Sequence, residues 1–152
     1  MTSGVAEPYF LDTNVLVYAN IVQAPLHQLA RETIQRLDDA GHNLWISRQI
    51  IREYLATVTR PQPFASPMAV PVAINRVRYF LRRFAVAEDT AETTEQLLTM
   101  LEQIPTGGSQ MHDANIVATM QVYGVRQILT HNTHDFARFG HLITVVPLEP
   151  TP

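Results

Sequence analysis

The amino-acid sequence predicts an α/β domain of three layers, in which helices cover both faces of a central, mainly parallel sheet of four to five strands. Two observations support this fold class. Short apolar runs typical of buried strands alternate with longer segments in which apolar residues recur at helical spacing. Glycine, proline and helix-capping residues separate these segments. Strands that alternate with helices favour parallel pairing, and right-handed crossovers then place helices on both faces of the sheet.

The length and composition fit one domain. The chain has 152 residues, of which 46% are hydrophobic, and domains commonly have roughly 100 to 150 residues. We expect the domain to span residues 8–147, with short tails at 1–7 and 148–152. The chain has no cysteine, which excludes disulfides and thiolate ligands and fits a reducing compartment. Because neither a signal peptide nor a membrane span is evident, we expect a cytoplasmic protein that does not enter a membrane.

The charge pattern excludes several function classes. A formal net charge of -3 argues against binding nucleic acid through bulk positive charge, so any such contact must be local. Every basic side chain is Arg, and no Lys occurs. Without Lys the chain can be neither a P-loop NTPase nor an enzyme that forms a lysine Schiff base.

Start and stop signals divide the first half of the chain. Gly41 stands where a glycine commonly ends a helix, Ser47 can cap the next helix, and Pro61 and Pro63 end it. The predicted elements are a strand at 9–11, a helix at 15–19, a helix at 26–37, a strand at 43–46, a helix at 50–58 and a proline-rich connector at 60–71. We predict no role for this connector.

The second half continues the alternation. Ser109 is expected to cap a helix that Gly124 ends. The predicted elements are a helix at 72–84, a strand at 85–87, a helix at 90–104, a turn at 105–108, a helix at 109–123, a strand at 126–129, a polar loop at 130–136 and a strand at 142–146. Two of these helices have a predicted buried stripe, formed by Ile74, Val77, Leu81 and Phe84 in the first and by Ala91, Thr94, Leu97, Leu98 and Leu101 in the second.

Four acidic residues are candidates for one site. Asp12 ends the first strand, and Asp135 follows the strand at 126–129. Glu53 borders the buried stripe of its helix, and Asp113 lies in the first turns after Ser109. Ligands of open parallel sheets bind outside the carboxyl ends of the strands, where loops and helix N-termini meet. The four carboxylates are therefore expected to converge at one edge of the sheet.

Each acid also has a purely structural interpretation. Asp12 or Thr13 can cap a helix, and Glu53 can form an ion pair with Arg48 or Arg52. Asp113 can be favoured by the positive end of its own helix, and Asp135 or Asn132 can stabilise a turn. The four acids together favour a site over these separate explanations.

Converging carboxylates repel one another unless a hard cation lies between them, and Mg²⁺ or Mn²⁺ prefers oxygen ligands. Such a site can hydrolyse the backbone of a nucleic acid, since the cation activates water and offsets phosphate charge. We expect Asp12 and Asp113 to be the main ligands, Asp135 a water-mediated or second-metal ligand, and Glu53 the orienter of the water or its base. Thr13, with Thr130 and Asn132, can support these ligands.

The sequence resembles a known family in four motifs. These are Phe10-Leu11-Asp12-Thr13-Asn14-Val15-Leu16, Arg52-Glu53-Tyr54, His112-Asp113-Ala114 and Leu129-Thr130-His131-Asn132-Thr133-His134-Asp135-Phe136. The chain looks like a PIN domain over about residues 8–147, and more narrowly like a VapC-like toxin ribonuclease of a toxin-antitoxin module. The resemblance implies a Mg²⁺- or Mn²⁺-dependent endoribonuclease with a three-layer α/β/α fold. It also implies an RNA substrate, a homodimer and a cognate antitoxin.

The chain departs from the family pattern at one position. Many members carry Asp where this chain has Asn132, with a second acid three residues later, where this chain has Asp135. The fourth acidic role is therefore open between Asn132 and Asp135, and the site can hold one ion or two. An alternative to the enzyme is a catalytically silent PIN fold that binds RNA or protein.

Other candidate sites are weaker. A dehalogenase-type phosphatase needs a second Asp two residues after Asp12, where this chain has Asn14, and it also needs a Lys. His131 and His134 lack the partners of a zinc site. The arginines at 76–83 can bind phosphates or an acidic stretch of an antitoxin, and are also consistent with a solvated helix face. Aromatic residues that can stack on bases, or lie in the core, are Tyr18, Tyr54 and Phe136.

Overall fold

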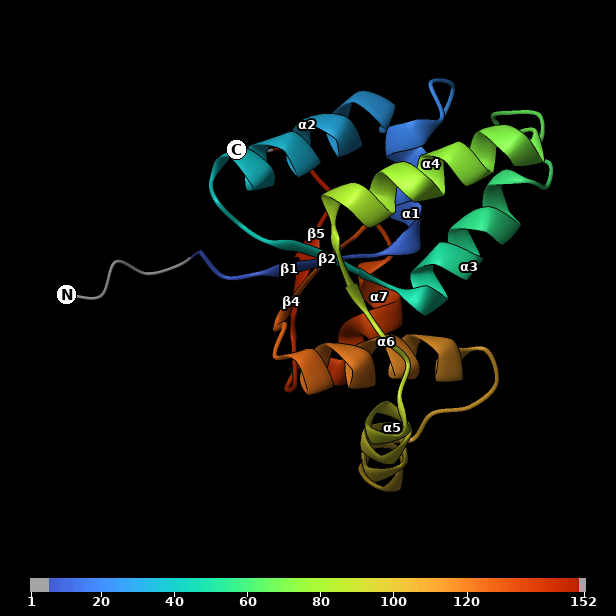
Figure 1. Ribbon diagram of the computed structural model, residues 1–152. Coiled ribbons are helices and arrows are strands. Elements are labelled where there is room, and N and C mark those ends of the chain that lie inside the picture. Colours follow the sequence, from blue (N-terminus) through green and yellow to red (C-terminus); the bar gives the residue numbers. More distant parts are fainter. Residues whose placement is uncertain (1–5, 151–152) are drawn as a thin grey trace.

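Five short parallel strands form the central sheet in a computed structural model of the chain, which describes residues 6–150 (Figure 1). The order across the sheet is β3-β2-β1-β4-β5, and each neighbouring pair is parallel. The strands are β1 (Tyr9–Leu11), β2 (Leu44–Ser47), β3 (Ala85–Ala87), β4 (Gln127–Thr130) and β5 (Thr144–Pro147). The predicted sheet is confirmed.

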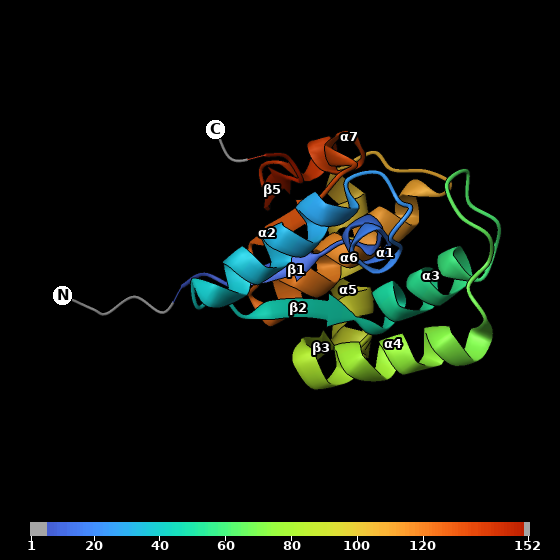
Figure 2. The ribbon, with the colours of Figure 1, turned by 90° about the horizontal axis from the view of Figure 1, so that it is seen from above.

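Helices cover both faces of this sheet, so the predicted three layers are also confirmed. The first four helices lie on one face and the last ones on the other, with α5 packed mainly on α6 (Figures 1 and 2). The helices are α1 (Thr13–Asn20), α2 (His27–Asp39), α3 (Arg48–Val58), α4 (Val70–Arg83), α5 (Ala91–Gln103), α6 (Gln110–Tyr123), α7 (Thr133–Phe136) and the short 3-10 helix η1 (Ala137–Phe139). Within residues 6–150, no helix is long and apolar enough to cross a membrane.

The chain changes its direction across the sheet between β3 and β4. It moves from β1 outward to β2 and β3, and then crosses back to place β4 against the other side of β1. Leu11 of β1 pairs with Leu129 of β4, so Asp12 and Thr130 leave the sheet side by side. This is the switch point at which open α/β sheets bind their ligands.

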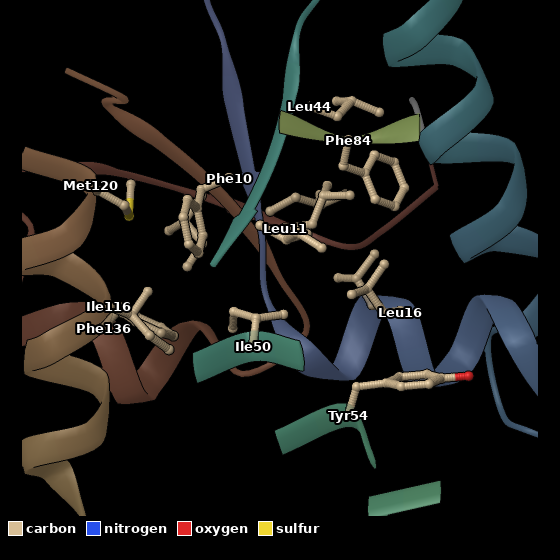
Figure 3. Packing of buried hydrophobic residues seen from close by; sticks show 14 of the residues in the cluster. Phe10, Leu11, Leu16, Leu44, Ile50, Tyr54, Phe84, Ile116, Met120 and Phe136 are labelled. Atoms are coloured by element: carbon tan, nitrogen blue, oxygen red, sulfur yellow. The ribbon is translucent and has the colours of Figure 1, made fainter. Parts of the chain in front are cut away.

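The core lies on both faces of β1. Phe10 and Leu11 are fully buried, and they point to opposite faces because successive side chains of a strand alternate (Figure 3). Ile50 of α3 and Ile116 of α6 pack from the two helical layers. The most central strand is therefore held from both sides, and the residue that follows it has little freedom to move.

Most of the predicted boundaries are confirmed. Ser47 caps α3, since its hydroxyl accepts a hydrogen bond of 3.2 Å from the Ile50 backbone amide. Gly41 and Gly124 follow α2 and α6 in the left-handed region, with φ of 87° and 70°, which favours glycine. Ser109 precedes α6, but its side chain makes no capping hydrogen bond, so this predicted cap is wrong in its chemistry.

The predicted buried stripe of α4 is wrong at two positions. Ile74 and Leu81 are 40% and 42% exposed. The buried positions of this helix are Ala73 and Phe80, and Phe84 directly after it is also buried. Because α4 has apolar residues on more than one face, periodicity alone could not determine which face meets the core.

Two other expectations need correction. The predicted stripe of α5 is wrong at Ala91, Thr94 and Leu98, which are exposed, while Thr93 and Met100 are the buried residues. The predicted polar loop at 130–136 contains the short helix α7, which begins directly after Asn132. This turn of helix places Asp135 back towards the end of β4.

Candidate active site

Asp12 occupies the switch point between β1 and β4. It is the N-cap of α1, and its Oδ1 accepts a hydrogen bond of 2.8 Å from the Thr13 backbone amide. Its Oδ2 accepts hydrogen bonds from the Thr130 hydroxyl at 2.7 Å and from Asn14 Nδ2 at 3.1 Å. Asp12 is only 7% exposed. The capping interpretation is thus correct, but it uses only one of the two carboxylate oxygens.

Asn14 and Thr130 tie the end of β1 to the end of β4. Asn14 Nδ2 also donates to the Thr130 hydroxyl at 3.3 Å, and Asn14 Oδ1 accepts a hydrogen bond of 3.0 Å from the His131 backbone amide. The Thr130 hydroxyl further accepts one of 3.0 Å from the Asn132 backbone amide. Thr130 was expected as a supporting residue, whereas Asn14 was missed. Its proximity to Asp12 in the sequence was the available signal.

Glu53 projects from α3 towards the start of α1. Its Oε1 accepts a hydrogen bond of 3.5 Å from the Thr13 hydroxyl, and its Oε2 accepts one of 3.3 Å from Gln49 Nε2. Arg48, the first expected ion-pair partner, instead binds Glu88 at 2.7 Å. Neither of the two ion pairs among residues 6–150 includes Glu53. Polar neutral groups therefore hold this carboxylate at the pocket.

Gln49 links α3 to α6 beside Glu53, and sequence reasoning missed it. Its Nε2 donates to the His112 carbonyl oxygen at 2.9 Å, and its Oε1 accepts a hydrogen bond of 2.8 Å from Asn115 Nδ2. Gln49 is buried, so these bonds satisfy an otherwise costly amide. This bridge fixes the segment that carries Asp113 relative to Glu53.

The four expected acids line a single pocket of about 410 Å³. We call it the acidic pocket and define it by Asp12, Glu53, Asp113 and Asp135. Thr13 and Asn132 also line it, while Thr130 lies buried behind Asp12. Asp135 is exposed, and Glu53 and Asp113 are partly buried. Four segments that are far apart in the sequence therefore meet at the carboxyl edge of the sheet.

The pKa values of three of these acids are raised. Burial, followed by repulsion from Asp12, Asp135 and Glu53, raises the pKa of Asp113 to about 7. Burial and the nearby charge of Asp12 raise the pKa of Glu53. Burial also raises the pKa of Asp12, against the opposing effect of its three hydrogen bonds. Each carboxylate is thus destabilised in its charged form, partly by the others.

The donor set of this pocket suits a hard divalent cation. A carboxylate has about four lone-pair positions, and the hydrogen bonds from Thr13, Asn14 and Thr130 use three of those on Asp12. One position on Oδ1 remains for a ligand. Among the described residues, no group of three or more His, Asp or Glu side chains is already arranged to hold a metal ion. The residue types fit a cation, but the ligands are not drawn together around a point.

The far end of the same pocket has a different chemistry. Arg60, Gln62 and Phe64 of the proline-rich connector line it, together with Tyr18 of α1. Of the three aromatic residues considered from the sequence, Tyr54 and Phe136 are fully buried in the core, and only Tyr18 reaches the pocket. Phe64 was missed because a proline-rich connector shows no periodicity.

Comparison with known proteins supports the resemblance. A family model described as PIN domain matches residues 9–142. Ribonuclease VapC48 of Mycobacterium tuberculosis is 25% identical over 130 residues, which cover 84% of this chain and 89% of that protein. Ribonuclease VapC24 of the same species is 24% identical over 133 residues, which cover 86% of this chain and 90% of that one.

Solved structures show the same fold. The crystal structure of VapBC2 from Rickettsia felis bound to a DNA fragment from its promoter contains a similar chain, with a TM-score of 0.63 and 23% sequence identity. The match covers 90% of this chain and 96% of the other. At this identity the likeness shows the arrangement of the elements, which agrees with the three layers described above.

Proposed function

This chain belongs to the PIN domain family, and from that membership we propose that it is a metal-dependent endoribonuclease, the toxin of a type II toxin-antitoxin module. The observation that carries the proposal is the acidic pocket, in which four carboxylates share one hollow at the switch point of the sheet. The similarity to two proteins named ribonuclease VapC supports RNA as the substrate.

Each acid has a separate role in this proposal. Asp12 and Asp113 hold the cation, since Asp12 is fixed by three hydrogen bonds and the charged form of Asp113 needs a counter-charge. Glu53, held by Thr13 and Gln49, orients the attacking water and takes its proton. Asp135 fills the fourth acidic position rather than Asn132, because its charge acts on both Asp12 and Asp113.

The cofactor in this proposal is Mg²⁺ or Mn²⁺, which supplies positive charge that makes water a better nucleophile and offsets the charge of the phosphodiester. The protein itself holds the acidic side chains in position. The Asn14 and Thr130 hydrogen bonds prevent Asp12 from turning away, and the Gln49 bridge keeps Glu53 and the start of α6 in register.

An RNA-cleavage assay with Mn²⁺ tests the activity. We expect the purified chain to cleave RNA and the variants Asp12→Asn and Asp113→Asn to lose roughly 10²- to 10⁴-fold in rate. Asp89→Asn is the matched control, since Asp89 follows β3 at the same edge of the sheet but does not line the acidic pocket. If the wild type cleaves no RNA in a broad panel, the chain is a silent PIN fold. If Asp12→Asn and Asp113→Asn cleave RNA as fast as Asp89→Asn, the cleavage does not come from the acidic pocket and the nuclease proposal is wrong.

Thermal unfolding tests the cation separately from activity. A ligand at 100 times its dissociation constant stabilises the folded state by about 2.7 kcal/mol, which corresponds to a rise of roughly 5 to 10 °C in the melting temperature of a chain of this size. We expect this rise with Mn²⁺ for the wild type and for Asp89→Asn, and a much smaller one for Asp113→Asn. An equal rise in Asp113→Asn would place the cation elsewhere.

A cognate antitoxin is the proposed regulatory partner. A hollow of about 510 Å³ between α2 and α4 is lined by Arg31, Arg76 and Arg83, with Phe80 and Phe84 beside them. We call it the arginine groove. Guanidinium groups next to aromatic rings suit a peptide that carries both acidic and apolar residues. Co-purification of this chain with the product of a neighbouring small gene, and its loss in Arg76→Glu, tests the assignment.

A second copy of this chain is the other proposed partner. Val70, Ile74 and Leu81 recur at helical spacing on α4 and are 56%, 40% and 42% exposed. Exposed apolar side chains in a row are typical of protein interfaces. Light scattering of the purified chain gives its mass in solution, and a monomer would contradict this part of the proposal.

A further inference from the structure

The acidic pocket continues into a wall of aromatic rings. Tyr18 lies 5.5 Å from His131 and 6.3 Å from Phe64, measured between ring centroids, and both contacts are edge-to-face. We call Tyr18, Phe64 and His131 the aromatic wall. They come from α1, from the proline-rich connector and from the segment after β4. Tyr18 and Phe64 line the same pocket as the four acids.

The rings of this wall are accessible. Tyr18 and Phe64 are half-buried and His131 is exposed. An edge-to-face contact covers only one face of one ring, so the two contacts leave other faces for a ligand. A planar nucleobase can stack on such a face whatever its identity, because every base has a π-face.

The part of the pocket between the acids and the aromatic wall is long enough for one nucleotide. Glu53 and Thr57 follow one another along α3, and Arg60 comes two residues after its end. Val17 of α1 lines the same pocket. Tyr18 lies five positions after Thr13 on α1, which is roughly 8 Å along a helix. A nucleotide next to a phosphodiester held at the acids therefore reaches the rings.

The connector that carries Phe64 has a fixed shape. Gln62 and Ala65 exchange two backbone hydrogen bonds of 3.0 and 3.2 Å, and the Gln62 side chain donates to the Thr57 carbonyl oxygen at 2.7 Å. The Met68 amide donates to the Val58 carbonyl oxygen at 2.7 Å. The connector thus folds back onto the end of α3 before it enters α4 (Figure 2). Phe64 is positioned before any ligand arrives, which lowers the entropy lost on binding.

Arg60 supplies the only arginine in the lining of this pocket. The acids at one end repel the negative backbone of a nucleic acid, and the guanidinium at the other end attracts it. The overall charge of -3 gives no general attraction. A local guanidinium group beside stacking rings is therefore suited to hold an RNA strand outside the acids themselves.

We propose that the aromatic wall with Arg60 is a binding subsite for an unpaired nucleotide of single-stranded RNA, next to the phosphodiester at the acidic pocket. This inference rests on the proposed function for its substrate class. The base stacks on the rings of Tyr18 and Phe64, and Arg60 binds the adjoining phosphate. The subsite selects for unpaired RNA, since a base held in a duplex cannot stack on the wall. It also gives a role to the connector at 60–71, for which the sequence predicted none.

A binding assay without catalysis tests the subsite. The probe is a short single-stranded RNA that contains the fluorescent base 2-aminopurine, and the protein is the full chain with Asp113→Asn in EDTA, so that no cleavage occurs. We expect fluorescence quenching on binding, and weaker binding to the same RNA in a duplex. Phe64→Leu removes the ring but keeps an apolar side chain, and should weaken binding roughly 5- to 150-fold. Phe64→Trp should restore it.

Matched controls lie at the other end of the sheet. Tyr9 is half-buried and contacts His42 edge-to-face at 4.9 Å, so Tyr9→Leu removes a comparable ring outside the pocket and should leave binding unchanged. Arg60→Gln should reduce the slope of log affinity against log salt by about one, whereas Arg126→Gln, directly before β4, should not. A melting curve for each variant checks that it folds.

The outcomes separate this inference from the proposed function. If Phe64→Leu binds the probe as the wild-type residue does, or loses no more than Tyr9→Leu, the subsite is wrong even where the chain cleaves RNA. If the chain cleaves no RNA but the probe is quenched with the expected dependence on Phe64, the nuclease proposal fails and the subsite stands.

Discussion

The acidic pocket and the arginine groove are two hollows that share the helix α1 and carry opposite charge. Val17 and Tyr18 of α1 line the pocket, whereas Leu16, Ala19 and Asn20 line the groove. The pocket gathers four carboxylates, and the groove gathers three guanidinium groups. A net charge of -3 describes neither. The difference shows that one short helix can separate a site suited to cation chemistry from a surface suited to an acidic partner.

Two neighbouring residues of α3 show the same contrast on a smaller scale. Glu53 accepts hydrogen bonds from Thr13 and Gln49 at the acidic pocket. Tyr54 is fully buried against Phe80, which lines the arginine groove, and its hydroxyl is a buried oxygen without a hydrogen-bond partner among the described residues. The carboxylate of Glu53 is thus held by hydrogen bonds, whereas the hydroxyl of the next residue, Tyr54, has none. Substitution of Glu53 should therefore reduce activity, whereas removal of the Tyr54 hydroxyl should raise stability.

The largest effect is expected from the same substitution made in each hollow. Glu53→Gln should reduce RNA cleavage with Mn²⁺ by roughly 10²- to 10⁴-fold, because an amide cannot take a proton from water. Glu32→Gln, in the lining of the arginine groove, should leave the rate within about twofold. Initial rates on one RNA substrate measure both. Equal losses would mean that the two hollows are not functionally distinct.

A smaller effect concerns the pH dependence of stability without metal. The pKa of Asp113 rises from 3.8 in the unfolded chain to about 7 in the folded one, so the folded state binds more protons between these values. Stability should therefore fall as pH rises from about 4 to about 7, and change little above that. Because Asp113 is half exposed, screening reduces this loss to about 1 to 2 kcal/mol.

Melting curves in EDTA across this pH range measure the slope of stability against pH, and Asp113→Asn should make this slope flatter. Arg76→Ala, in the arginine groove, should keep the slope of the wild type. An unchanged slope in Asp113→Asn would show that the charge repulsion resides in other groups.

The smallest effect is expected beside the groove. Tyr54→Phe should raise the free energy of unfolding by about 1 kcal/mol, since it removes a buried hydroxyl that lacks a partner. The melting temperature should rise by roughly 2 to 4 °C. Burial also raises the pKa of Tyr54 to about 12, so this hydroxyl stays neutral throughout the measurement. A decrease in stability would show that the hydroxyl makes a favourable interaction.

The sequence predicted the sheet and the convergence of its acids because both depend on local patterns. The strand that ends at Asp12 and the strand that precedes Asp135 are short apolar runs, and the carboxyl ends of parallel strands share one edge. Which neutral groups support the acids was not predictable in the same way. Gln49 meets Asn115 across 66 positions of the chain, and no periodicity records such a contact.

The faces of single helices were also beyond the sequence pattern. Leu81 and Phe80 are adjacent apolar residues of α4, yet Phe80 is buried and Leu81 is 42% exposed. The tertiary position of a helix decides which of its apolar faces meets the core. Phe64 could not be predicted for a different reason. It lies in a connector without periodicity, whose shape depends on hydrogen bonds to α3.

The hydrogen bond between Thr130 and Asp12 joins residues 118 positions apart, and this affects when the site can exist. During synthesis Asp12 leaves the ribosome long before β4 and Asp135, which follow more than 100 residues later. Before β4 pairs with β1, Asp12 lacks the Thr130 hydroxyl and the pocket lacks one wall. Pairing of such distant segments is a late step of folding. The acidic pocket is therefore assembled only after β4 and Asp135 have been made, and a nascent chain that stops before them has no complete site.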